Sequence, residues 1–376
     1  MSGLDILRRV SASLSHGRWG PARPLDRVPS VSVVIPCYNY GRYLRQCVGS
    51  VIHDQPGVDV EVIIVDDKST DDSLEIARAI EKEDRRVRVI AHERNKGHIA
   101  TYNDGLEAAT GEFVLLLSAD DLATPGALTR AAELLAAEPT VGLVYGNAIT
   151  FVGDPPPSRN DGKGWIVWSG RQWLQSRCLS GYNVAASPEV VMRTSVLREN
   201  GGYRPDLPHA GDFEMWLRTS AVSDIGFLMG VDQAYYRQHG VNMNRRDFGS
   251  GTDRGLLIDL KQRWECFEAV FAGPGARLEN GASLLQTARE TIASQALGCV
   301  NYAYARGIKD FPADEFEALA DEIHADVRKS PAGRALMRRK KAGMSSLPVH
   351  PLWLTSALGW RLKNVLRHRR RHLIGI

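Results

Sequence analysis

The stretch Phe113-Val-Leu-Leu-Leu-Ser-Ala-Asp-Asp121 is an apolar run of strand length that ends in two adjacent carboxylates. A buried strand that stops at acidic residues places them at the rim of a sheet, where open α/β sheets bind their ligands. Two neighbouring carboxylates, Asp120 and Asp121, repel each other unless a cation lies between them, and oxygen ligands suit Mg²⁺ or Mn²⁺. The stretch therefore predicts a divalent-metal site that binds a phosphorylated substrate. An acidic helix N-cap beside one solvated aspartate is the structural alternative.

The residues on either side alternate between apolar runs of strand length and helical patterns. Val31–Ile35, Val60–Val65 and Val87–Ala91 precede the central strand, and Val141–Tyr145 follows it. Helical segments of roughly 10 to 15 residues separate these runs, as in a mainly parallel sheet with helices on both faces. The predicted fold class is therefore α/β.

The pattern becomes looser beyond Asn147, where polar loops separate shorter elements. Three predicted strands and one predicted helix remain: Pro188–Arg193, Ile225–Met229, Gln233–Arg237 and the helix Asp212–Ser220. Residues from about 252 to 330 have a helical pattern without a catalytic constellation.

The composition excludes several classes of protein. Of the 376 residues, 43% are hydrophobic and 24% are charged, as in ordinary globular proteins. The five cysteines lack the spacing of a zinc site or a disulfide framework, which favours a reducing compartment. No apolar run approaches the roughly 18 residues of a membrane span, and no signal peptide is found. We therefore expect a cytoplasmic protein.

The charge is distributed unevenly along the chain. The net charge is +3, yet residues 331–376 hold 11 Lys and Arg and no Asp or Glu, so the preceding part is acidic. Five apolar residues of this tail share one helical face, with tryptophans beside it: Leu354, Leu358, Leu362, Val365 and Leu366, then Trp353 and Trp360. Such a helix suits the anionic inner face of the cytoplasmic membrane. Packing on the acidic body of the protein is the alternative, and nucleic acid is not expected as a partner.

Three further polar clusters follow predicted strands. After the first strand, Pro36 stops the ladder, while Tyr38 and Asn39 offer a stacking face and an amide. After the second strand, Asp67 can accept hydrogen bonds from a base or from ribose hydroxyls. An ordinary strand-to-helix turn and a helix N-cap are the alternatives.

The third cluster, Arg94-Asn-Lys-Gly97 with Asn103, follows the third strand. Gly97 permits a close backbone approach, and the amide and cationic groups suit a ribose and a diphosphate. A solvated surface is the alternative for each of these residues alone. Because parallel strands end at one edge of a sheet, we expect the clusters to converge there, as a nucleotide pocket requires.

Together these motifs resemble the family 2 glycosyltransferases. The resemblance covers about residues 31–242 and rests on Val33-Val-Ile-Pro-Cys-Tyr-Asn39, Val65-Asp-Asp-Lys-Ser-Thr-Asp71, Asn95-Lys-Gly with Tyr102-Asn-Asp-Gly, and Gly111 to Asp121. It implies a GT-A fold and an inverting sugar transfer that depends on Mn²⁺ or Mg²⁺. The implied donor is a nucleotide-diphosphate sugar, above all a UDP- or dTDP-sugar. The implied acceptor is a hydroxyl of a growing polysaccharide or lipid-linked oligosaccharide.

The resemblance also implies roles for single residues. The base and ribose pocket would be lined by Pro36, Tyr38, Asn39 and Asp67. Asp120 would face the ribose, and Asp121 would bind the metal that bridges the diphosphate. Further donor contacts would come from Asn95, Gly97, Asn103 and Arg237, and further metal ligands from Asp120 and His239. Many relatives carry an acid two places before the second aspartate, where this chain has Ala119.

An inverting transfer needs one general base to take the proton of the acceptor hydroxyl. Gly211-Asp-Phe-Glu-Met-Trp-Leu-Arg218 resembles the acidic helix start of the family, and we expect Asp212 to be the base. Glu214 is the competitor, although it would point about 200° away on a helix. Without the resemblance, a helix N-cap would be the preferred reading of Asp212.

Rival functions are an inactive nucleotide-sugar-binding scaffold, a nucleotidyltransferase and a dehydrogenase. The presence of three acids, Asp67, Asp121 and Asp212, argues against the scaffold. No glycine-rich phosphate loop follows the first strand, which argues against the other two. The predicted organisation has four parts: an appendage (residues 1–30), a GT-A domain (31–250, with a nucleotide-sugar half at 31–150 and an acceptor half at 151–250), a helical region (251–330) and a basic tail (331–376).

Overall fold

The computed structural model describes the chain except residues 1–16, 163, 241, 250 and 344–353. The predicted appendage therefore lies largely outside the described residues, as does Trp353. The chain forms two compact units. One comprises residues 1–173, 183–239 and 371–376, and the other comprises residues 174–182 and 240–370. This grouping differs from the predicted boundaries, because residues 174–182 and 371–376 each join the unit that is distant in sequence.

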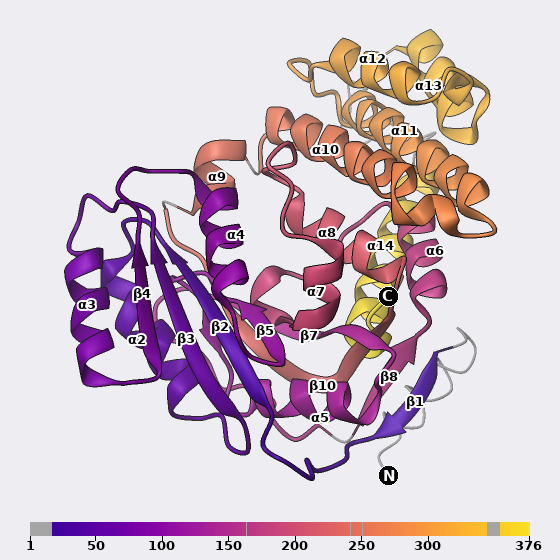
Figure 1. Ribbon diagram of the computed structural model, residues 1–376. Helices are drawn as coiled ribbons and strands as arrows, with labels where there is room; N and C mark the ends of the chain where they lie inside the picture. Colours follow the sequence, from indigo (N-terminus) through magenta and orange to yellow (C-terminus); the bar gives the residue numbers. More distant parts are fainter. Residues whose placement is uncertain (1–16, 163, 241, 250, 344–353) are drawn as a thin grey trace. The chain divides into compact units, whose positions relative to one another are not determined.

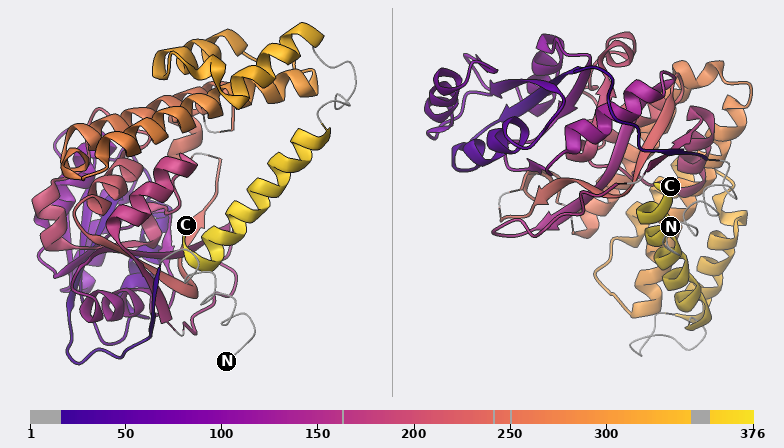
Figure 2. Two further views of the ribbon diagram at one scale, coloured as in Figure 1. Left: turned by 90° about the vertical axis from the view of Figure 1, so that its right-hand side faces the viewer. Right: turned by 90° about the horizontal axis from the view of Figure 1, so that it is seen from below.

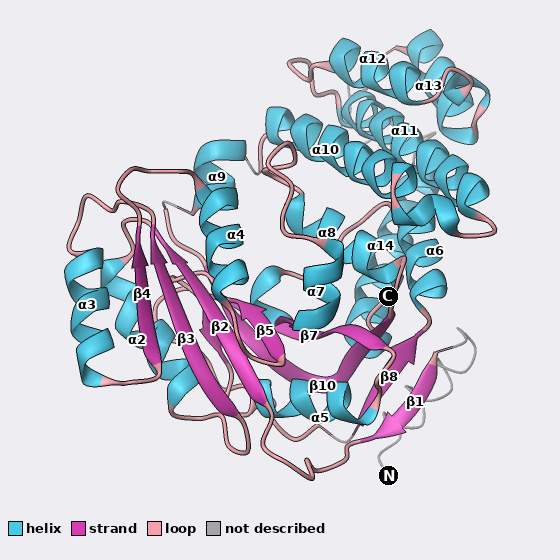
Figure 3. Cartoon of the chain, in the orientation of Figure 1, coloured by secondary structure: helices cyan, strands magenta, loops and turns pink. Residues whose placement is uncertain are grey.

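The first unit is built on one ten-stranded sheet (Figures 1 and 3). The strand order is β1-β8-β10-β7-β9-β5-β2-β3-β4, and β6 pairs with β10. The strands are β1 (Arg18–Pro21), β2 (Ser30–Cys37), β3 (Asp59–Asp66), β4 (Val87–Ala91), β5 (Phe113–Leu116), β6 (Leu122–Ala123), β7 (Val141–Phe151), β8 (Gly164–Trp168), β9 (Val190–Arg193) and β10 (Asp224–Arg237).

Most of the strands point the same way. β2 pairs in parallel with β3 and β5, β3 with β4, and β7 with β10. β9 runs antiparallel between β5 and β7, and β8 and β6 run antiparallel to β10. The predicted mainly parallel α/β sheet is confirmed, with the antiparallel strands confined to the half that contains β6, β8 and β9.

Helices cover both faces of the sheet, as the alternation of side chains along β2 requires. Val31, Val33 and Ile35 share a core with α2 (Gly41–Ile52), α3 (Ser73–Glu83) and α5 (Ala127–Ala137). Val34 points to the opposite face, where α4 (His98–Ala108) packs. A Cβ on Gly105 would lie 2.3 Å from Val34 Cγ1, so this glycine lets α4 approach the sheet closely.

The first strand does not stop at Pro36, as predicted, but continues to Cys37, and Pro36 pairs with Val65 of β3. The reason is the side to which its nitrogen points. The carbonyl of Val34 accepts from Leu117 on the β5 side, and the period of two places the Pro36 nitrogen on that same side. Because the β5 ladder ends at Leu116, no strand partner is lost there.

Other differences concern the second half of the sheet. The two predicted strands at 225–229 and 233–237 form one strand, β10, which bends through register shifts. The predicted strand Pro188–Arg193 begins as a 3-10 turn (Ser187–Glu189) before β9. β8 was not predicted as a strand, and its first two residues, Gly164 and Trp165, lie at the end of a segment predicted as a polar loop (residues 160–165). The helix predicted at Asp212–Ser220 is confirmed as α8 (Gly211–Ser220), and α7 (Thr194–Asn200) precedes it.

The second unit is helical. It contains the end of α6 (Gly170–Ser180), α9 (Met243–Phe248), α10 (Asp253–Ala272), α11 (Gly281–Arg306), α12 (Ala313–Ile323), α13 (Pro331–Ala342) and most of α14 (Leu354–Ile374). Thr252 caps α10 by accepting from Gly255 N, and Ser330 caps α13 by accepting from Gly333 N. The predicted helical region is confirmed. Among the described residues, no helix combines the length and apolarity that crossing a membrane requires.

The burial of Glu189 in the first unit predicts how the stability of the protein depends on pH. Its side chain is wholly buried, and burial raises its pKa to about 7 although the Arg371 guanidinium opposes the shift. Because the unfolded carboxyl titrates near 4.5, folding stability is greatest below that pH and falls as pH rises through about 7. Glu189→Gln should remove this pH-dependent decrease in the free energy of unfolding, which amounts to about 3 kcal/mol.

The measurement is urea unfolding of both proteins at pH 5 and pH 8. We expect the variant to gain stability relative to wild type between these values, with the exposed Glu199→Gln as the matched control. Parallel pH dependences of the variant and wild type would contradict the account.

Candidate active site

The carboxyl edge of β2, β3 and β5 brings the predicted clusters together. The loops after β2 and β3 join where Asn39 N donates to Ser69 Oγ at 3.0 Å and Asn39 Oδ1 accepts from Thr70 N at 2.7 Å. Asn39 and Lys68 both have positive φ, 61° and 60°, a backbone conformation that non-glycine residues rarely adopt. Tyr38 beside them is 37% exposed, which leaves its ring accessible for stacking. By accepting from Thr70 N, the Asn39 side-chain oxygen fixes the conformation of the loop after β3.

Asp67 connects the loop after β3 with the loop after β4. Its Oδ1 lies 2.8 Å from His92 Nδ1 and accepts from Lys96 N at 2.7 Å, and its Oδ2 accepts from Gly97 N at 2.9 Å. Asn95 Nδ2 donates to the Asp67 carbonyl at 3.0 Å. The predicted residues Asp67, Asn95 and Gly97 therefore lie together. His92 was not predicted, because a histidine at the end of a strand carries no signal by itself.

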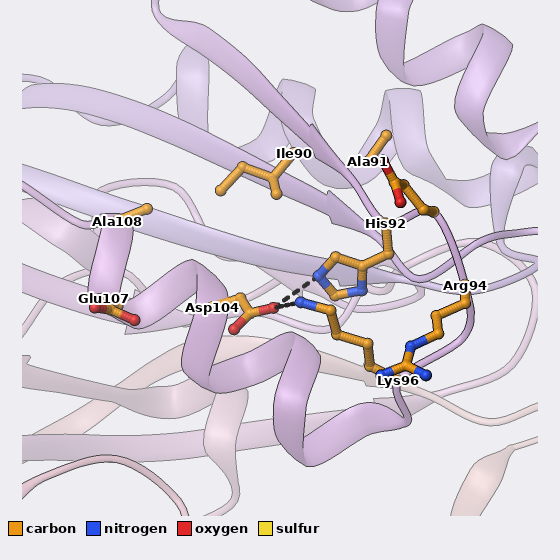
Figure 4. A pocket seen from close by; sticks show the side chains of 9 residues that line it. Ile90, Ala91, His92, Arg94, Lys96, Asp104, Glu107 and Ala108 are labelled. Carbon is orange, nitrogen blue, oxygen red and sulfur yellow. Dashed lines mark hydrogen bonds and ion pairs between the residues drawn. The ribbon is translucent and has the colours of Figure 1, made fainter.

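An open pocket of about 780 Å³ lies next to this loop (Figure 4). Inside it, Asp104 Oδ2 lies 2.9 Å from His92 Nε2 and 2.6 Å from Lys96 Nζ. The lining residues are Ile90, Ala91, His92, Glu93, Arg94, Lys96, Asp104, Glu107 and Ala108. They include none of the predicted metal ligands and not the predicted base.

Asp120 and Asp121 are both buried, 7% and 2% exposed, just beyond β5. Burial, reinforced by the negative charge of Asp120, raises the pKa of Asp121 well above its usual range. Asp121 Oδ1 accepts from Arg237 N at 2.8 Å, and Asp120 Oδ2 lies 2.9 Å from His239 Nε2. The end of β10 therefore holds both carboxylates.

The Arg237 guanidinium is directed into the protein. It donates to the carbonyl of Asp120 at 2.8 Å, the carbonyl of Gly153 at 3.0 Å and the Gln46 side chain at 2.6 Å. It also lies 4.8 Å from the centre of the Tyr43 ring. These contacts hold the Arg237 guanidinium against the Asp120 backbone, and its contact with the diphosphate stays a prediction.

His239 lies against two aromatic rings of the loop and helix that follow β2. Its ring stacks on Tyr43 with centroids 5.3 Å apart, and the edge of Tyr40 is 5.6 Å away. This packing aims Nε2 at Asp120. The contact between His239 and Tyr43 could not be predicted, because a histidine in a polar loop does not indicate which distant residue it will contact.

The residues predicted to bind a divalent cation are Asp120, Asp121 and His239. Within the described ranges, no group of three or more His, Cys, Asp or Glu side chains is arranged to hold a metal ion. Mg²⁺ is commonly held by one or two carboxylates together with substrate phosphates. Burial, followed by the charge of Asp120, raises the pKa of Asp121, and the two buried carboxylates fit a site of this two-carboxylate kind.

Asp212 lies in the first turn of α8, in the same unit. Its Oδ2 accepts from Asn183 Nδ2 at 3.1 Å, and its Oδ1 from Phe213 N at 2.7 Å. Glu214, the competitor, is 1% exposed and pairs with Arg218 through both oxygens at 2.9 Å. This ion pair occupies both carboxylate oxygens of Glu214. Asn183 was not predicted.

Tyr102 of α4 is half-buried and feels the charges of two of the acids. Burial, followed by the negative charges of Asp120 and Asp212, raises its pKa. Asn103, the next residue, was expected to contact the donor. Its Nδ2 donates to the Tyr203 carbonyl at 2.9 Å and its Oδ1 accepts from Tyr203 N at 2.7 Å, so it fixes the loop that precedes α8. The contact of Asn103 with the donor stays a prediction.

Residues 32–198 match the family described as Glycosyl transferase family 2. An uncharacterized glycosyltransferase of Haemophilus influenzae is 27% identical over 223 residues, covering 57% of this chain and 68% of that protein. The chondroitin synthase of Escherichia coli is 28% identical over 222 residues, covering 58% of this chain but 30% of that protein. Residues 32–198 therefore form a family 2 glycosyltransferase domain.

The fold is similar to that of the mannosyltransferase PcManGT from Pyrobaculum calidifontis. The two share 18% sequence identity with a TM-score of 0.50, covering 90% of this chain and 94% of that one. A likeness at this level of identity concerns the fold, and it confirms the predicted GT-A architecture.

Proposed function

We propose that the protein transfers a sugar, with inversion, from a nucleotide-diphosphate sugar to a hydroxyl of a growing glycan. The observation that carries the proposal is that Asp67, Asp120 and Asp121 follow neighbouring parallel strands at one sheet edge, and that the charges of Asp120 and Asp212 both raise the pKa of Tyr102. The chondroitin synthase relative supports a polysaccharide acceptor. The mannosyltransferase, whose structure contains GDP-Man and Mn²⁺, supports a sugar-nucleotide donor and a divalent cation.

The chemistry is a single displacement. Asp212 takes the proton of the acceptor hydroxyl while that oxygen attacks the anomeric carbon, and the bond to the diphosphate oxygen breaks. The nucleoside diphosphate leaves with the bonding electrons. A bound divalent cation would neutralise the charge that develops on the diphosphate. Asp120, Asp121 and His239 would hold it, and Tyr38 and Asp67 would contact the base.

The test is a panel of UDP-, dTDP- and GDP-sugars, with Mn²⁺ or Mg²⁺ and with oligosaccharide or lipid-linked acceptors. We expect turnover of one donor and its loss in EDTA. Binding of that donor without turnover by any acceptor would favour the alternative, an inactive nucleotide-sugar-binding scaffold. Absence of binding by every donor would overturn both.

The second part of the proposal concerns α14 and places the protein on the inner face of the cytoplasmic membrane. Leu358, Leu362, Val365 and Leu366 are 50% to 70% exposed and recur at helical spacing along one face. Exposed arginines accompany them, at positions 361, 367, 369 and 370. An exposed apolar stripe with cations and without acids suits an interfacial helix on anionic lipid. The helix α14 that carries it is drawn in yellow in Figure 2.

Leu362→Asp should abolish sedimentation of the protein with phosphatidylglycerol vesicles. A buried carboxylate would oppose insertion of the stripe, and the exposed side chain makes the change harmless to folding. Leu179, 63% exposed on α6, gives the matched control Leu179→Asp. Wild-type binding should weaken as salt rises and be absent with phosphatidylcholine alone. Equal sedimentation of the two variants would contradict the assignment.

A further inference from the structure

Residues Arg371–Ile376 belong to the first unit although they end α14. Ile374 is 1% exposed, and its carbonyl accepts from Trp168 Nε1 at 3.1 Å. The next carbonyl, of Gly375, accepts from the Tyr145 hydroxyl. Gly375 has φ +81° and a Cβ there would lie 2.5 Å from Phe227 Cγ, so the segment fits one specific place on the sheet.

Arg371 connects this segment to the loop that leads into β9. Its Nε donates to the Val184 carbonyl at 2.8 Å, and its Nη2 lies 3.3 Å from Glu189 Oε1. Glu189 in turn accepts from Ala186 N at 2.8 Å. One guanidinium therefore contacts both ends of residues 184–189, and it supplies the countercharge for a wholly buried carboxylate.

The same loop holds α8. Asn183, the residue before the Val184 contact, donates from Nδ2 to Asp212 Oδ2 at 3.1 Å. The loop fixes that amide, because Ala185 N donates to Asn183 Oδ1 at 3.2 Å. The Ala185 carbonyl accepts from Trp216 Nε1 of α8 at 3.1 Å. The contacts of Arg371 and those of α8 thus meet on consecutive residues.

We propose that Arg371 is a positioning residue for the transfer reaction: by fixing residues 184–189 it sets the Asn183 amide that orients the Asp212 carboxylate. The inference rests on the proposed role of Asp212 as base. Arg371 touches neither donor nor acceptor in this account. Its effect is on the geometry of proton removal, which is sensitive to displacements of about 1 Å.

The test compares Arg371→Ala with Arg85→Ala, an exposed arginine in the turn between α3 and β4, at pH 8, above the pKa of about 7 of Glu189. For Arg371→Ala we expect kcat to fall roughly 10- to 100-fold. The Kd for the nucleoside diphosphate and the donor KM should stay near the wild-type values. Arg85→Ala should behave as wild type. A purely structural role would instead lower kcat and donor affinity together, with a lower Tm.

Asn183→Ala supplies the second variant, which also applies if Arg371→Ala does not fold. It should reproduce the loss of kcat, and Arg371→Ala should add little to it, since both act on the same carboxylate. The inference would be overturned if the losses of kcat multiplied in the double variant. It would also be overturned if either Asn183→Ala or Arg371→Ala alone kept the wild-type kcat. If wild type turns over no donor, the proposed function fails. If wild type is active and Asp212→Asn is inactive, the proposed function stands, and the results for Arg371→Ala and Asn183→Ala then test the inference alone.

Discussion

Replacing Asp212 by Asn is expected to lower kcat by about 10²- to 10⁴-fold, the usual contribution of a general base. The amide can no longer take the acceptor proton, yet it keeps an oxygen and nearly the same volume, so the Phe213 N–H retains an acceptor. Donor binding should therefore persist. The measurement pairs initial rates with calorimetric titration of the nucleoside diphosphate.

The control for Asp212→Asn is Asp206→Asn. Asp206 is an exposed acid in the loop before α8 that pairs with Arg204 at 2.7 Å, and its loss should leave kcat unchanged. If Asp212→Asn retained wild-type kcat, the base would have to be sought elsewhere in the acceptor half. Glu214 would be a weak replacement because Arg218 engages both of its oxygens.

Replacing Asp121 by Asn should lower kcat/KM by about 10²- to 10³-fold, the magnitude seen when one group that stabilises developing charge is lost. The Asn oxygen can still accept from Arg237 N, so the end of β10 stays in place. The charge that would bind a divalent cation is removed. Because burial already opposes ionisation of Asp121, the neutral amide should not destabilise the fold.

The readout that identifies the metal role is the donor titration with and without Mn²⁺. Wild type should bind the donor more tightly with Mn²⁺, whereas Asp121→Asn should bind it equally in both conditions. Asp59→Asn, an exposed acid at the opposite end of β3, serves as the control and should keep the Mn²⁺ response. A Mn²⁺ response retained by Asp121→Asn would contradict its place in the metal site.

The sheet edge could be predicted because its signals are local. Apolar runs that end in polar residues define strand and rim together, so Asp67 and Asp121 were placed at one edge before any contact was known. The strand Val87–Ala91 was predicted with the bounds that the structure gives. Each of these inferences needs only a few consecutive residues.

The parts that could not be predicted depend on contacts between distant residues. β8 forms in a glycine-rich segment because β1 and β10 pair with it on either side. Nothing in the sequence indicated that Arg237 and Asn103 donate to the carbonyls of Asp120 and Tyr203. Arg371 meets Glu189 across 182 residues of chain. A charge pattern along the sequence cannot reveal such partners.

The most direct test of the central claim, an inverting sugar transfer, is the anomeric configuration of the product. NMR gives this configuration from the coupling constants of the anomeric proton of the transferred sugar. A single displacement assisted by Asp212 predicts a β-linked product from an α-linked donor. An α-linked product would mean that the configuration is retained. That result would contradict both the inverting mechanism and the role of Asp212 as the one base.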